Sequence, residues 1–228
     1  MTRLYVFDLD GTLVDSLRDL SDTANELLVD CGGARLDMDA VGQMVGEGVG
    51  TLVARVFAAA GIAQPQDAVD RFLAIYATRL LNHTRPYDGI VEVLTALSSR
   101  ATLAVLTNKP LAATNEILDG LGLSRFFDGA SVLGGDGDVP RKPDPTGMMK
   151  ICAHANVSAS ATMLVGDSLI DWQTARNAKT TVCLARYGFG YRQFPRDVLR
   201  GDERLIDHPL ELVHPAYPAP PARRASRD

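Results

Sequence analysis

Short apolar runs alternate with amphipathic segments over much of the chain. The runs have the length and composition of buried strands, and the segments between them carry apolar residues at helical spacing. The predicted strands are residues 4–7, 102–106, 130–133, 162–165 and 181–184, and the predicted helices are residues 90–99, 111–119, 146–155 and 168–178. Strands that alternate with helices of this length indicate crossover connections and a parallel sheet.

The segment from residue 16 to residue 82 has a different pattern. Apolar residues fall at helical spacing over 16–31, 49–60 and 69–80, with a shorter helical stretch at 39–45, and no run is typical of a strand. Asp15 or Ser16 can cap the first of these helices, and Gly32 can end it. We therefore expect an all-helical insertion after the first strand, with joints near residues 12–15 and 82–87 that can act as hinges.

Composition and charge exclude several classes of protein. The 228 residues are 46% hydrophobic and carry 23 Lys and Arg against 28 Asp and Glu, a net charge of −5, which argues against a nucleic-acid binder. Three cysteines without close pairing argue against a disulfide framework or a structural zinc site. The N-terminus lacks a signal-peptide core, and no apolar run approaches the roughly 20 residues of a membrane helix. We expect a cytoplasmic protein.

Polar residues suited to catalysis follow the predicted strands. Because ligands bind at the carboxyl ends of parallel strands, these residues are expected to meet at one edge of the sheet. They are Asp8 and Asp10 after the first strand, Thr107 and Asn108 after the second, Asp167, Ser168 and Asp171 after the fourth, and Lys142 before the helix that leads into the fourth. Carboxylates gathered in this way would repel one another without a cation, and oxygen ligands favour Mg²⁺.

Each of these residues also has an ordinary structural explanation. An aspartate at a strand end often caps the next helix, Asp171 can be a solvated helix residue, Lys142 can be an exposed loop residue and Gly11 can simply form a turn. The convergence of several distant segments on one edge favours a functional site over these separate explanations.

The motifs resemble those of the haloacid dehalogenase-like superfamily. FDLDGTLVDS at residues 7–16 resembles its first motif, Thr107-Asn108 its second, Lys142 in RKPDP its third, and Gly166-Asp167-Ser168 with Asp171 its fourth. TNKP at residues 107–110, GGD at 134–136 and GDSLIDWQTARNA at 166–178 are further similar to the phosphoglycolate phosphatase family. Pyrophosphatase and sugar-phosphatase relatives share part of this wording.

The resemblance implies an α/β fold in which an all-helical cap domain is inserted into a Rossmann-like parallel sheet core. The expected core is residues 1–15 and 83–192, the expected cap is residues 16–82, and residues 193–228 form a C-terminal extension. From His214 onwards four prolines and three arginines predict a partly disordered tail.

The resemblance also implies the role of each site residue. Asp8 is the nucleophile, and Asp10 is the general acid and base. Mg²⁺ is held by Asp8, Asp167 and the backbone carbonyl of Asp10, and the phosphoryl oxygens are held by Thr107, Asn108 and Lys142. Gly11, Ser168 and Asp171 support these groups, with Asp171 orienting Lys142 or a metal-bound water.

The expected function is Mg²⁺-dependent hydrolysis of a small phosphate monoester by a monomer or homodimer. The favoured substrate is 2-phosphoglycolate, with an inorganic pyrophosphatase or a sugar-phosphate phosphatase as alternatives. A phosphate-sensing or partner-binding module on an inactive hydrolase fold is a further alternative, which the intact Asp8, Asp10, Lys142 and Asp167 disfavour. The expected partner is a small phosphorylated metabolite, with no nucleic acid and no membrane.

Three residues depart from the family's usual pattern. Lys179 stands where glycine is common at the end of a helix. Either a left-handed lysine there costs about 1 kcal/mol, or the helix ends differently. Trp172 replaces a smaller aliphatic residue, and packing under the sheet is favoured over contact with substrate. Glu47 lies in the loop of residues 46–50 expected to select the substrate, and whether it points inward is left open.

Overall fold

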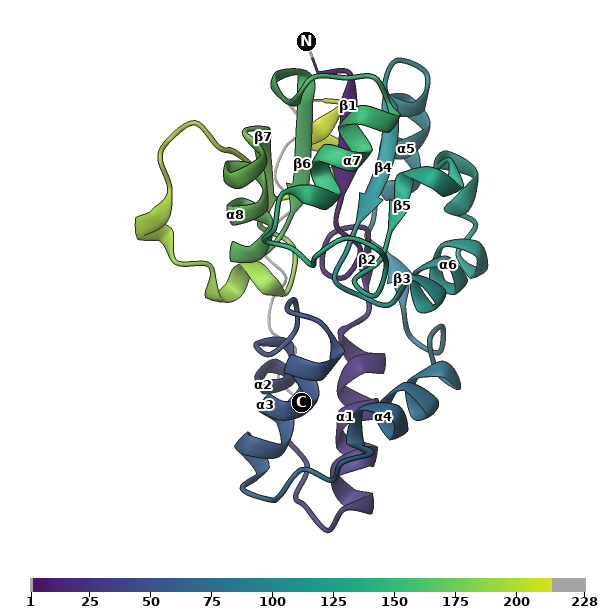
Figure 1. Ribbon diagram of the computed structural model, residues 1–228, viewed down its shortest axis with the longest axis vertical. Coiled ribbons are helices and arrows are strands. Elements are labelled where there is room, and N and C mark those ends of the chain that lie inside the picture. Colours follow the sequence, from purple (N-terminus) through teal and green to yellow (C-terminus); the bar gives the residue numbers. More distant parts are fainter. Residues whose placement is uncertain (1, 215–228) are drawn as a thin grey trace.

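The computed structural model describes residues 2–214 and consists of an α/β part and a helical part joined end to end (Figure 1). Six parallel strands form the sheet of the α/β part, in the order β5-β4-β1-β6-β7-β8. The strands are β1 (Leu4–Phe7), β4 (Thr102–Leu106), β5 (Val132–Leu133), β6 (Thr162–Gly166), β7 (Thr181–Ala185) and β8 (Arg204–Ile206). The expected α/β fold with a parallel sheet and a helical insertion is confirmed.

Helices cover both faces of the sheet. They are α5 (Ile90–Ser98), α6 (Leu111–Gly120), α7 (Thr146–His154) and α8 (Leu169–Ala178). The central strand β1 is buried on both sides, because Tyr5 and Phe7 enter one hydrophobic cluster with α5 while Leu4 and Val6 enter a second cluster with α7 and α8. Burial on both faces explains why β1 is apolar at every position.

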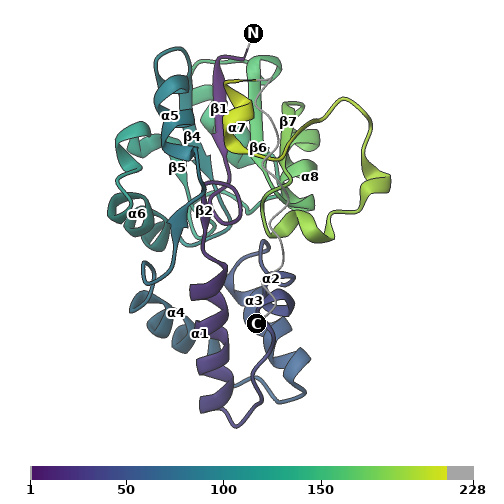
Figure 2. The ribbon, with the colours of Figure 1, turned by 180° about the vertical axis from the view of Figure 1, so that it is seen from behind.

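The helical region consists of α1 (Leu17–Asp30), α2 (Met38–Gly42), α3 (Val49–Ala60) and α4 (Ala68–Ala77). These helices pack on one another below the carboxyl ends of the strands, as the front and back views show (Figures 1 and 2). Their apolar faces belong to the same hydrophobic cluster as Phe7 and α5, so the apolar interior continues from the sheet into the helical region.

A short antiparallel ribbon joins the two parts. Its strands, β2 (Val14–Asp15) and β3 (Arg85–Pro86), lie within the two segments expected to be hinges. The buried carboxylate of Asp19 on α1 accepts hydrogen bonds from the backbone of His83 and Thr84 and from the Thr84 hydroxyl, at 2.8–3.1 Å. The ribbon and Asp19 therefore hold side by side the two chain segments that connect the α/β part to the helical part.

The observed elements differ from the expected ones mainly at their ends. The ribbon strands and β8 were not predicted, because each is only two or three residues long. The strand expected over residues 130–133 is shortened to β5, since residues 129–131 form a 3₁₀ turn. The division into core, cap and extension stays a prediction, and the predicted tail lies outside the described residues except for His214.

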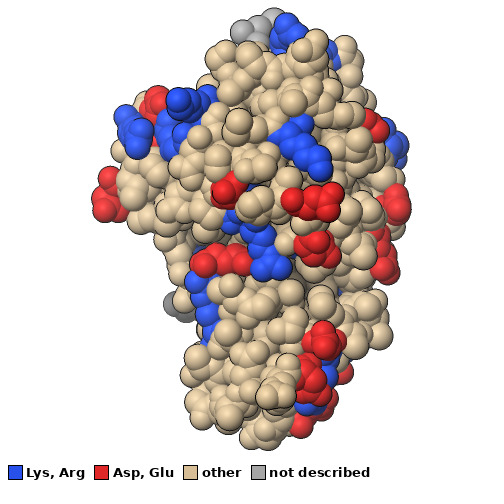
Figure 3. All heavy atoms as spheres, viewed as in Figure 1, with Lys and Arg blue, Asp and Glu red and all other residues tan. Residues whose placement is uncertain are grey.

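Acidic and basic side chains are interspersed over the face shown in Figure 3 rather than gathered by sign. Within residues 2–214, no helix combines the length and the apolar character that spanning a membrane requires.

Candidate active site

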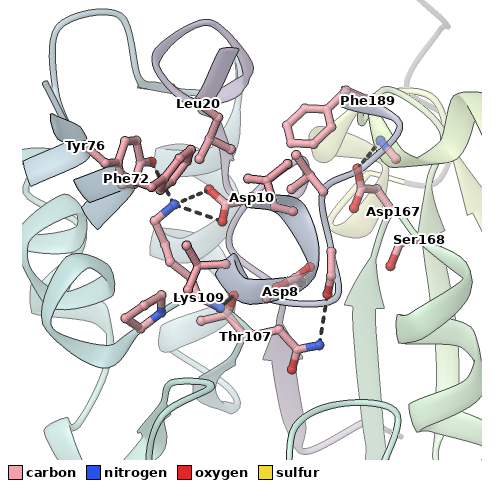
Figure 4. A pocket seen from close by; sticks show the side chains of 18 of the residues that line it. Asp8, Asp10, Leu20, Phe72, Tyr76, Thr107, Lys109, Asp167, Ser168 and Phe189 are labelled. Atoms are coloured by element: carbon pink, nitrogen blue, oxygen red, sulfur yellow. Dashed lines mark hydrogen bonds and ion pairs between the residues drawn. The ribbon is translucent and has the colours of Figure 1, made fainter. Parts of the chain in front are cut away.

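A pocket lies where the carboxyl ends of β1, β4 and β6 meet the helical region (Figure 4). Its sheet side carries polar residues that were all predicted from strand ends, namely Asp8, Asp10, Thr107, Asn108, Asp167 and Ser168. Its other side is largely apolar, with contributions from α1, α3 and α4 and from the loop that precedes α3. The expected convergence of distant strand ends on one site is therefore seen in the fold.

Lys142 is a buried cation bound to two carboxylates. Its ammonium lies 2.9 Å from Asp8 Oδ1 and 2.6 Å from Asp171 Oδ1. Asp171 is in turn fixed at the start of α8 by a capping box, in which its Oδ2 accepts from the backbone and hydroxyl of Ser168 at 3.0 and 2.6 Å. Both oxygens of Asp171 are therefore engaged, one by Lys142 and the other by Ser168, and the supporting role of Ser168 and Asp171 stays a prediction.

Three buried carboxylates gather at the centre of the site. Asp8, Asp167 and Asp171 each offer an oxygen within 4.8 Å of the others. Burial raises the pKa of the Asp8 carboxyl to about 6, with Lys142 opposing the shift and Asp171 adding to it. Burial also holds the pKa of Asp167 well above its usual value, with further contributions from Asp171 and Asp8.

Such a cluster fits a divalent cation. Hard cations prefer oxygen ligands, and their charge would offset the repulsion between these carboxylates. Lys142 and Ser168 engage both oxygens of Asp171, whereas Lys142 and the Leu9 N–H contact the same oxygen of Asp8, Oδ1. Asp8 and Asp167 are therefore better placed than Asp171 to hold an ion. That the Asp10 backbone carbonyl is a third ligand stays a prediction.

The backbone around Asp167 leaves no room for side chains. Gly11 has φ +80°, and a Cβ built on it would lie 2.0 Å from Asp167 Oδ2. A Cβ on Gly188 would lie 2.4 Å from the same carboxylate, and the Gly190 N–H donates to Asp167 Oδ2 at 2.8 Å. Gly11 thus provides both the turn after β1 and the space for Asp167. Its supporting role in the reaction stays a prediction.

The Asn108 side chain connects three segments of the site. Its Nδ2 donates to the Gly46 carbonyl at 2.9 Å and to the Lys142 carbonyl at 3.0 Å, and its Oδ1 accepts from the Lys142 backbone N–H at 2.8 Å. The Thr107 hydroxyl accepts from the backbone N–H of Lys109 at 3.2 Å. Phosphoryl binding by the Asn108 backbone N–H and by the Thr107 hydroxyl stays a prediction.

Lys109 is a further residue of the site, to which the sequence analysis gave no role. Its ammonium lies 3.0 and 3.1 Å from the two carboxylate oxygens of Asp10 and donates to the Tyr76 hydroxyl at 2.7 Å. Burial opposes the charge, but Asp10 and Tyr76 outweigh it and raise the pKa of Lys109 above its usual value. Its place directly after Thr107-Asn108 was the available signal, yet sequence spacing does not show that it turns inward.

Comparison with known proteins shows the family of this chain. A family model described as "Haloacid dehalogenase-like hydrolase" matches residues 5–185. The chain belongs to the haloacid dehalogenase-like hydrolase family. It is 42% identical over 198 residues to a phosphoglycolate phosphatase of Rhodospirillum rubrum, covering 83% of this chain and 81% of that protein.

Two further similarities extend over more of this hydrolase. It is 36% identical over 212 residues to a phosphoglycolate phosphatase of Agrobacterium fabrum, covering 91% of this chain and 89% of the relative. A crystal structure described as a predicted phosphoglycolate phosphatase from Haemophilus somnus superimposes with a TM-score of 0.86 at 29% identity, covering 95% of this chain and 98% of the other.

The three residues that depart from the family pattern, Glu47, Trp172 and Lys179, do not line the pocket. Glu47 forms an exposed ion pair with Arg55, so it does not point at the substrate space, although its neighbours Gly46 and Gly48 line the pocket. Trp172 packs in the hydrophobic cluster of α7 and α8, and its Nε1–H donates to Glu203 at 2.7 Å. Lys179 has the left-handed conformation at the end of α8, with φ +57°, which is the first of the two alternatives given for this position.

Proposed function

We propose that this hydrolase is a Mg²⁺-dependent phosphatase that converts 2-phosphoglycolate to glycolate and phosphate through an aspartyl-phosphate on Asp8. The observation that carries the proposal is the buried Lys142 ammonium 2.9 Å from Asp8 Oδ1, beside the carboxylate of Asp167. The phosphoglycolate phosphatases of Rhodospirillum rubrum and Agrobacterium fabrum, similar over most of their length, support the choice of substrate.

The first step forms a bond between an Asp8 oxygen and phosphorus while the ester oxygen leaves. Attack by a carboxylate on a phosphate dianion brings two anions together, so positive charge must be in place beforehand. Lys142 supplies part of that charge, and Asp171 keeps its ammonium directed at Asp8. Mg²⁺ held by Asp8, Asp167 and the Asp10 carbonyl would supply the remainder.

Asp10 is proposed to move the protons. It donates a proton to the departing glycolate oxygen, and then takes one from the water that hydrolyses the aspartyl-phosphate. Asp10 and Asp8 lie in different surroundings, since Asp10 contacts Lys109 and Ser16 while Asp8 contacts Lys142.

The opposite wall of the pocket is apolar and disfavours a sugar. Leu20, Val49, Leu52 and Phe72 line that wall, which offers little hydrogen bonding to a polyhydroxylated sugar. Glu47 is turned away with Arg55, so it does not repel a substrate carboxylate. The location of the protein is a separate proposal. Cys31, Cys152 and Cys183 are free thiols, as is usual in a reducing compartment, so we propose a cytoplasmic location.

Phosphate release from a panel of substrates tests the proposal. We expect kcat/KM to be higher for 2-phosphoglycolate than for glycerol phosphate, hexose phosphates and pyrophosphate. EDTA should abolish the activity and added Mg²⁺ should restore it. A tenfold or greater preference for a neutral ester would indicate a sugar-phosphate phosphatase instead. Activity that survives EDTA would contradict the role of a metal.

A further inference from the structure

A buried lysine links the helical region to the edge of the sheet. Lys109 follows β4, and only 4% of its side chain is exposed. Its ammonium lies between the Asp10 carboxylate on one side and the Tyr76 hydroxyl of α4 on the other (Figure 4). Among the residues that line this pocket, within the described part of the chain, Lys109 is the one with a cationic side chain.

Lys109 and Lys142 bind different carboxylates of the site. Lys142 is bound to Asp8 and Asp171, whereas Lys109 is bound to both oxygens of Asp10. A second residue, Ser16, also binds Asp10, and its hydroxyl donates to Oδ1 at 2.5 Å. Ser16 precedes α1 and Tyr76 lies on α4, so the groups that surround the Asp10 carboxylate come from, or are held by, the helical region.

The packing of Tyr76 on α4 places its hydroxyl and its ring against the Lys109 ammonium. It is buried in the hydrophobic cluster beside Phe72, and its ring centre lies 4.5 Å from the Lys109 ammonium. The Tyr76 hydroxyl accepts a hydrogen bond from that ammonium, so displacement of α4 would remove one of the partners that fix Lys109.

We propose that Lys109 is a positioning residue that holds the Asp10 carboxyl in place for proton transfer and, through Tyr76, makes that placement depend on the helical region lying over the pocket. The inference rests on the proposed phosphatase function and assigns to Lys109 a part in that reaction.

Replacement of Lys109 by methionine tests the positioning role, because methionine has a similar length without the charge. Three substrates are compared: 2-phosphoglycolate and glycerol phosphate, whose leaving groups need a proton, and p-nitrophenyl phosphate, whose leaving group barely needs one. We expect kcat of Lys109→Met to fall about 10²-fold on both alkyl esters, as misplacement of a catalytic group does. The loss on p-nitrophenyl phosphate should be much smaller.

Two patterns would overturn the positioning role. An equal loss of kcat on all three substrates would show that Lys109 serves the architecture of the site in general. A rise of KM for 2-phosphoglycolate alone would show that Lys109 binds the substrate's carboxylate instead. Lys150→Met, at an exposed position of α7, is the matched control and should behave as wild type.

Tyr76→Phe tests the link to the helical region with a milder change. Loss of one hydrogen bond should lower kcat about fivefold on the alkyl esters. It should add nothing in a Lys109→Met background, because the bond is then already absent. Additive losses in the double variant would overturn the link, as would a Tyr76→Phe enzyme equal to the control Tyr191→Phe, whose ring stacks on Phe194.

The wild-type enzyme separates this inference from the proposed substrate. Hydrolysis of glycerol phosphate without hydrolysis of 2-phosphoglycolate would refute the substrate and leave the Lys109 comparison to be decided on the other two esters. A folded wild-type protein that releases phosphate from none of the three esters would refute both proposals.

Discussion

At the scale of single residues, the site consists of polar groups that the sequence places at strand ends. Asp8, Thr107 and Asp167 could be predicted, because the carboxyl ends of neighbouring parallel strands must meet. Lys109 could not, since its inward direction depends on Asp10 and Tyr76, which are distant in sequence. The direction of Glu47 likewise depends on Arg55 and not on a local pattern.

Asp10→Asn should lower kcat by about 10²–10⁴-fold on 2-phosphoglycolate, the usual contribution of a positioned proton donor. The amide cannot donate the proton that the departing alkoxide needs. The loss should shrink on p-nitrophenyl phosphate, and steady-state kinetics on the two substrates provide the comparison. Equal losses on both would count against Asp10 as the acid.

Glu47→Gln should leave the kinetics nearly unchanged on both 2-phosphoglycolate and glycerol phosphate. Glu47 is exposed and paired with Arg55 outside the substrate space, and such surface pairs contribute little. The measurement is kcat/KM on each ester. A gain confined to the carboxylate substrate would show that Glu47 points inward during turnover.

At the scale of elements, the turn after β1 joins backbone conformation to chemistry. Long apolar and amphipathic patterns predicted most helices and strands, whereas the ribbon β2–β3 and the edge strand β8 are too short to leave a pattern. The turn itself was visible as Asp8-Leu9-Asp10-Gly11, but the close approach of Gly11 to Asp167 required the fold.

Gly11→Ala should reduce both stability and Mg²⁺ binding, because its Cβ would overlap the Asp167 carboxylate. Gly32→Ala is a matched control, since Gly32 has φ +79° and no atom within 4 Å of the added Cβ. The two variants share a backbone cost of roughly 1 kcal/mol, so a further loss in Gly11→Ala measures the overlap. Thermal unfolding with and without Mg²⁺ checks it, and equal behaviour of the two variants would contradict the account.

At the scale of the whole molecule, the helical region covers the pocket that the sheet builds. The alternation of strands and helices predicted the parallel sheet, and the uniform helical pattern of residues 16–82 predicted the insertion. The contact of Tyr76 with Lys109 could not be predicted, since it depends on how α4 packs against α1 and on how the ribbon positions both helices.

The cluster of Asp8 and Asp167 predicts a selective response to metals. Mg²⁺ should restore activity after chelation, and Ca²⁺ should inhibit it. Ca²⁺ is larger and accepts both oxygens of a carboxylate, which would take from Asp8 the oxygen that attacks phosphorus. Phosphate release measured across a titration of each ion checks this, and full activity in Ca²⁺ would contradict the proposed arrangement.

The central claim is that the Asp8 carboxylate attacks phosphorus, and Asp8→Asn tests it most directly. The amide cannot act as the nucleophile. Because it is close in size to the carboxyl group, circular dichroism and thermal unfolding should confirm an intact fold. The account predicts that phosphate release from 2-phosphoglycolate in saturating Mg²⁺ is essentially abolished. Turnover within tenfold of wild type, on a protein with unchanged circular dichroism, would contradict it.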